Sequence, residues 1–125
     1  MTARLTKAAA AVIAERERQK TVEGWTEEHD DEHRGAQMAA AASCYAFVAS
    51  LGDKSYEYLR GNDHEGYPMW KSYPVLRDVW PWRDEWWKPK NRRSDLVRAG
   101  ALILAEIERL DRADEAARAA RRRPK

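Results

Sequence analysis

Two adjacent tryptophans and a run of basic residues form the pattern in this sequence that most clearly suggests chemistry. They stand directly before a predicted helix, in the order Trp86, Trp87, Lys88, Lys90, Arg92 and Arg93. Indole rings offer stacking faces to a nucleobase, and a helix start flanked by Lys and Arg binds anions such as phosphate. The segment therefore predicts both halves of a nucleotide site. The alternative is that the tryptophans fix a long loop onto a small core.

A second polar group, ERERQ at residues 15–19, ends a predicted first helix. Arg16 continues the helical row of Val12, and Glu17 continues that of Ile13, so both are expected to face inward or into a cleft. Arg16 and Arg18 are candidates to hold phosphate, because guanidinium groups bind it through paired hydrogen bonds. The alternative is a solvated face with internal ion pairs.

The third group, WTEEHDDEHR at residues 25–34, contains five acidic residues and two histidines without helical or strand periodicity. Trp25 and His29 are candidate ligand-binding residues. Clustered carboxylates beside imidazoles suit a divalent cation or acid–base catalysis, which makes Asp30 and Asp31 candidate Mg²⁺ ligands. The spacing matches no closed zinc site. The alternative is an exposed acidic loop that caps the next helix.

Glu106 is the fourth candidate, because it stands within the apolar run AGALILAEI. A carboxylate in such surroundings is costly unless it is paired or bound to metal. We expect Glu106 to lie near the site, either paired with Arg16 or Arg18, or holding Mg²⁺.

Composition limits what these groups can belong to. A chain of 125 residues allows one domain, and 23 basic against 21 acidic residues is too balanced to suggest nucleic acid as a partner. The single cysteine, Cys44, excludes a disulfide framework and fits a reducing compartment. Mean hydropathy is −0.86, the longest uncharged run is a poor membrane span, and early charges argue against a signal peptide. We therefore expect a cytoplasmic protein without a membrane partner.

Hydrophobic periodicity predicts an all-α fold with a three-helix core. The first helix spans residues 5–22, with Leu5, Ala9, Val12 and Ile13 on one stripe. The second spans residues 35–51, carries no charge, and should be buried on all sides. The third, capped by Ser94, runs from Asp95 to about Ala120. Its apolar stripe consists of Leu96, Gly100, Ile103, Ile107 and Leu110, widened by Val97, Ala101 and Leu104.

The long connection between the second and third helices, residues 53–93, contains four of the five prolines and nine of the twelve aromatic residues. A loop of this length in a small domain is expected to be ordered or functional, here with one short helix near Val75–Trp80. Residues 1–112 should form a single helical domain, and residues 113–125 a basic, Ala/Arg-rich helix end or tail. Three helices cannot easily bury both the second and the third, so we expect a homo-oligomer, with a dimer as the first choice.

Several of these segments together resemble a family of small phage and prophage proteins. The match covers residues 15–112 and rests on EGWTEEHDD and AGALILAEIERLDR. It implies a viral accessory protein acting in a bacterial cytoplasm, with no reaction attached. The sequence also bears a weaker resemblance to the all-α MazG-like nucleotide pyrophosphatases. The resemblance rests on the E-x-x-D spacing of Glu108 and Asp111 and of Glu28 and Asp31, and it implies that the protein binds Mg²⁺.

Three functions follow as hypotheses. The first is non-catalytic binding of a nucleotide, such as a signalling nucleotide of bacterial defence, with no cofactor. The second is a Mg²⁺-dependent nucleotide pyrophosphohydrolase that uses Asp30, Asp31, Glu106 and Glu15 or Glu17. The third is an accessory protein whose exposed aromatic residues bind a host protein.

Overall fold

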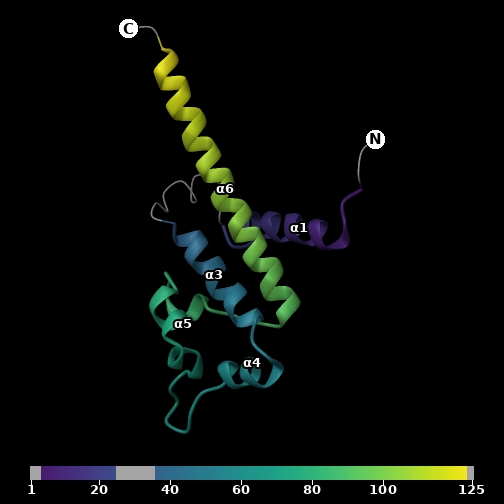
Figure 1. The fold of residues 1–125 in the computed structure, drawn as a ribbon, viewed down its shortest axis with the longest axis vertical. Helices are drawn as coiled ribbons and strands as arrows, with labels where there is room; N and C mark the ends of the chain where they lie inside the picture. The colour runs from purple at the N-terminus through teal and green to yellow at the C-terminus, as the bar shows by residue number, and fades with distance from the viewer. Residues whose placement is uncertain (1–3, 25–35, 124–125) are drawn as a thin grey trace.

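The computed structural model of the chain describes residues 4–24 and 36–123, and this part of the chain is all-α, as predicted. Figure 1 shows α6 as the long axis of the molecule, with α3 alongside it and α1 crossing it. The helices are α1 (Lys7–Thr21), α3 (Gln37–Ala49), α4 (Asp53–Arg60), α5 (Pro74–Val79) and α6 (Arg92–Arg122). None of the described helices is long and apolar enough to cross a membrane.

The core lies between α3 and α6. Seven residues of α3 are buried, and three of them are alanines. These small side chains let α6 approach with its own small residues Ala99 and Ala105. The prediction that this charge-free helix is buried on all sides is confirmed only in part, because Ala39 and Ser43 are exposed. The thiol of Cys44 lies inside this core, and its burial raises its pKa to about 11.

The predicted inward stripe of α6 is wrong for its four large aliphatic residues, whereas Gly100 faces Val12 of α1 and Ala101, which was predicted to widen the stripe, is fully buried. Leu96, Ile103, Ile107 and Leu110 are all about half exposed, whereas the buried face carries Leu102 and several alanines. Close packing against the alanines of α3 selects the small-residue face, although the larger side chains lie elsewhere. Ile13 of α1 is exposed for a related reason, because α1 meets α6 through Val12 and Gly100. Leu5, predicted on the same stripe, precedes α1 and is also exposed. A Cβ on Gly100 would lie 3.1 Å from Val12 Cγ2, so this crossing is close.

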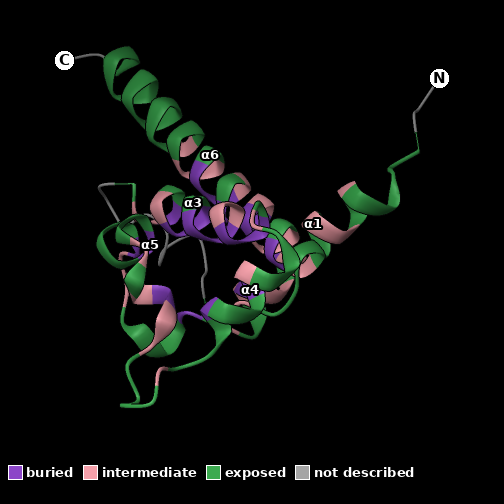
Figure 2. Cartoon of the chain, turned by 60° about the horizontal axis from the view of Figure 1, so that its bottom comes forward, coloured by how far each residue is buried: buried purple, intermediate pink, exposed green. Residues whose placement is uncertain are grey.

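The connection before α6 is ordered around a cluster of aromatic rings. Trp87 stacks on Tyr45 of α3 with ring centroids 4.9 Å apart, and its ring lies 5.0 Å from Trp80 and 5.6 Å from Trp70. The short helix predicted near residues 75–80 is present as α5. The additional helix α4 was not predicted, because only Tyr56 and Leu59 of its eight residues are buried. Figure 2 shows that most of α4 is exposed.

The cap of α6 also differs from the prediction. Asn91, not Ser94, is the N-cap residue, and its side-chain oxygen accepts a hydrogen bond from the Ser94 N–H at 2.8 Å. Asp95 follows in the first turn and is fully buried, where it accepts hydrogen bonds from the Tyr56 hydroxyl and the Lys90 N–H. Burial, and then the bond to Asp95, raise the pKa of Tyr56. These contacts fix residue 90 and α4 at the start of α6.

Candidate functional site

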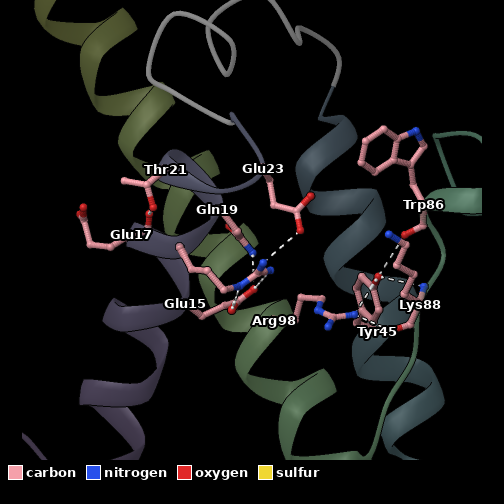
Figure 3. Close-up of polar contacts among 10 residues, drawn as sticks. Glu15, Glu17, Gln19, Thr21, Glu23, Tyr45, Trp86, Lys88 and Arg98 are labelled. Atoms are coloured by element: carbon pink, nitrogen blue, oxygen red, sulfur yellow. Dashed lines mark hydrogen bonds and ion pairs between the residues drawn. The ribbon is translucent and has the colours of Figure 1, made fainter.

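A polar cleft of about 420 Å³ opens beside the start of α6, and we call it the Trp86 cleft. Its walls come from α1, from Tyr45 of α3, from residues 86–90, and from the first turns of α6. Figure 3 shows Glu15 and Glu23 on the α1 side, Trp86 and Lys88 on the opposite side, and Arg98 between the two. The lining residues are Glu15, Arg18, Glu23, Tyr45, Trp86, Lys88, Lys90, Arg93, Ser94, Val97 and Arg98.

Arg98 and Tyr45 hold residues 86–88 in place. Arg98 Nη1 donates a hydrogen bond to the Lys88 carbonyl at 2.5 Å and another to the Tyr45 hydroxyl at 3.3 Å. Its guanidinium also lies 5.1 Å from the centre of the Tyr45 ring. The same hydroxyl donates to the Trp86 carbonyl and accepts from the Lys88 N–H, both at 3.4 Å. Burial raises the pKa of Tyr45 although Arg98 opposes this effect, so the hydroxyl keeps its proton at neutral pH.

The α1 wall is a closed set of ion pairs. Arg18 Nε and Nη2 donate to the two Glu15 oxygens at 2.7 and 2.8 Å, and Nη1 donates to Glu23 at 3.0 Å. Burial alone would raise the pKa of Glu15, but the hydrogen bonds from Arg18 and the charges of Arg18 and Arg98 outweigh burial and lower it. Glu15 therefore stays ionised, and Arg18 is already paired with two carboxylates.

The opposite wall carries basic side chains around an exposed ring. Trp86 is 43% exposed, and Lys88 Nζ lies 5.7 Å from the centre of its ring. Lys88, Lys90 and Arg93 form no ion pair with any carboxylate of the described residues. This wall therefore presents positive charge and an aromatic face to the same space.

The structure brings together Arg18, Trp86, Lys88, Lys90 and Arg93 of the predicted site residues. Three other predicted residues are placed elsewhere. Trp87 is buried in the core, Arg92 Nε donates to the Ala49 carbonyl at 2.8 Å, and buried Arg16 pairs with Glu108 at 3.0 Å. Trp25, His29, Asp30 and Asp31 lie outside the described residues.

Glu106 does not have the partner predicted for it. Arg109, one turn further along α6, donates to its carboxylate at 2.5 Å, because residues three apart share a helix face. Glu106 does not line the Trp86 cleft. Within residues 4–24 and 36–123, no three His, Cys, Asp or Glu side chains are grouped so that they could hold a metal ion.

Arg98 and Tyr45 are the site residues that sequence reasoning missed. Arg98 shares a helical strip with Asp95 and Leu102, which is the buried face of α6, so its inward position was available from the spacing. Tyr45 is the only residue with a phenol in a helix otherwise rich in alanine. A single polar aromatic side chain in such a helix was the sequence signal that could have marked Tyr45 as a site residue.

Compared with known proteins, the chain matches no family model, no curated protein and no solved structure.

Proposed function

We propose that the protein binds a nucleotide in the Trp86 cleft without cleaving it. The observation that supports this proposal is the half-exposed indole of Trp86 beside Lys88, Lys90 and Arg93, whose charges no described carboxylate balances. An aromatic face and clustered cations meet the two chemical needs of a nucleotide, which are stacking for the base and charge for the phosphates.

The dimensions and polarity of the cleft agree with such a ligand. A volume of about 420 Å³ lies within the usual range of small-molecule sites. In the proposed arrangement the base stacks on Trp86, and Lys88, Lys90 and Arg93 contact the phosphates. Glu15 and Glu23 already accept hydrogen bonds from Arg18, and the remaining lone pairs of their carboxylate oxygens suit ribose hydroxyls or base amino groups.

Binding without cleavage fits the charge distribution better than hydrolysis does. A Mg²⁺-dependent hydrolase needs a group of carboxylates free to hold the ion. Among the described residues, Glu106 is engaged by Arg109, Glu15 by Arg18 and Glu17 by Lys20. The other two candidate ligands, Asp30 and Asp31, lie outside the described residues. The phage accessory role implied by the sequence resemblance belongs to the same proposal, since a protein that sequesters a signalling nucleotide needs no catalytic group.

The experiment is to incubate the protein with linear and cyclic nucleotides, with and without Mg²⁺, and to identify the bound and heat-released compounds by chromatography. The proposal predicts that one nucleotide class is bound and recovered intact. Recovery of a cleaved product would contradict non-catalytic binding, and the absence of any bound nucleotide would contradict the proposal as a whole.

Two pairs of variants locate the binding. Trp86→Ala and the double variant Lys88→Glu/Lys90→Glu should each lose the ligand. Tyr67→Ala and Lys54→Glu are the matched controls, because both residues are exposed and neither lines the cleft. An equal loss of nucleotide binding in the control variants would show that the binding site is not the Trp86 cleft.

A further inference from the structure

Four large aliphatic residues form an uncovered stripe along α6. Leu96, Ile103, Ile107 and Leu110 are separated by steps of seven, four and three residues, which place them on one helix face. Each is between 47% and 53% exposed. The residues of α6 that pack on α3, such as Ala99 and Leu102, lie on a different face. We call these four residues the α6 stripe.

The C-terminal end of α6 does not pack against the other described helices. Every residue from 113 to 123 is exposed, and Figure 2 shows this part of the helix standing away from the rest of the molecule. Contiguous exposed apolar surface marks interaction sites, so the α6 stripe indicates that α6 packs against a further partner.

Charges at the two ends of the stripe indicate what that partner is. Arg92 and Arg93 precede Leu96, whereas Asp111 and Asp114 follow Leu110. A second α6 lying antiparallel would bring Arg92 and Arg93 of each copy toward Asp111 and Asp114 of the other, whereas the basic residues from Arg118 onward extend past the paired part. A parallel copy would place like charges together, which is unfavourable.

We propose that two copies of this chain associate through an antiparallel pairing of their α6 stripes. The stripe is close to symmetric about Ile103. When the Ile103 side chains of the two copies face each other across a two-fold axis, Leu96 of one copy lies opposite Leu110 of the other. The same register places Arg92 opposite Asp114 of the second copy, where it would share that carboxylate with Arg118 of the same helix, which lies 3.1 Å from Asp114. A self-complementary patch of this kind is the form that a two-fold interface requires, and the packing does not depend on nucleotide binding.

Light scattering on the full chain tests the association. The wild type should have twice the mass of one 14.5 kDa chain, and Ile103→Glu and Leu110→Glu should each reduce it to the mass of one chain. Val75→Glu on α5 is the matched control, because Val75 is 45% exposed outside the stripe, and it should keep the wild-type mass. Circular dichroism verifies that each variant is folded. A monomeric wild type, or a dimer that Ile103→Glu leaves intact, would overturn the proposal.

Cysteine cross-linking tests the orientation. Under mild oxidation Ile103→Cys should form a disulfide-linked dimer by itself, whereas Leu96→Cys should cross-link only when it is mixed with Leu110→Cys. The native Cys44 is buried and its raised pKa keeps it as a thiol, so it does not compete. Efficient cross-linking of Leu96→Cys with itself would indicate a parallel pair and overturn the arrangement.

Discussion

Trp86 and Trp87 are neighbours in the chain, yet they occupy opposite environments. Trp87 is 8% exposed and contacts the rings of Tyr45, Trp70 and Trp80. Trp86 ends a short 3₁₀ turn and is 43% exposed at the rim of the cleft. The composition of the segment predicted that tryptophan would serve both the core and a ligand. Which residue does which could not be predicted, because it depends on where Tyr45 of α3 stands.

Replacing each tryptophan with alanine should therefore have different effects. Trp87→Ala should lower the free energy of unfolding by about 3–5 kcal/mol, the cost of removing a large buried aromatic side chain. Trp86→Ala should lower it by less than about 1 kcal/mol, as for most exposed positions. Urea denaturation of both variants measures the difference. Equal losses would show that the two rings are not divided between core and cleft.

The lowered pKa of Glu15 predicts how this residue contributes to stability as a function of pH. Because the folded-state pKa lies below the ordinary value of 4.5, the contribution is present at neutral pH, above the unfolded-state pKa. It is lost as the pH falls through the folded-state value. Glu15→Gln should lower the melting temperature slightly at neutral pH and have no effect in strong acid. Glu57→Gln, at an exposed ion pair with Arg60, is the control. A difference between wild type and Glu15→Gln that is constant with pH would contradict this assignment.

At the scale of the elements, the character of each segment was more predictable from the sequence than the face that a helix buries. The charge-free residues of α3 predicted burial, and the prolines and aromatic residues predicted an ordered connection. For α6, large aliphatic residues indicated one face, but the alanines of α3 require small residues opposite them. Ala99 and Ala105 therefore point inward while Ile103 and Ile107 do not. Sequence periodicity alone does not reveal which neighbour a helix will meet.

The start of α6 gives a direct test of the observed cap. Asn91→Ala should destabilise the protein by about 1 kcal/mol, because it removes the side-chain acceptor for the Ser94 N–H. Ser94→Ala should have little effect, since the bond to Asn91 uses the backbone of Ser94. Urea denaturation of the two variants compares them. A larger loss for Ser94→Ala would restore Ser94 as the cap and contradict the structure at this position.

At the scale of the whole molecule, α1, the aromatic connection and α6 together build one cleft with unlike walls. Four of the predicted site residues meet there because residues 86–93 stay together in the chain, and a fifth, Arg18, comes from α1. Arg98 and Tyr45 come from separate helices and hold that segment in place. Their role depends on the pairing of α3 with α6, which the spacing of residues in either helix does not specify.

The most direct test of nucleotide binding in the Trp86 cleft is a calorimetric titration of wild type and Trp86→Ala. The probes are ATP and a cyclic dinucleotide, each measured at low and at high salt. We expect saturable binding by the wild type that weakens as salt rises, because salt screens the exposed charges of Lys88, Lys90 and Arg93. Trp86→Ala should show no measurable binding of the same probe. Wild-type binding that Trp86→Ala leaves unchanged, or no binding of either probe, would contradict the account.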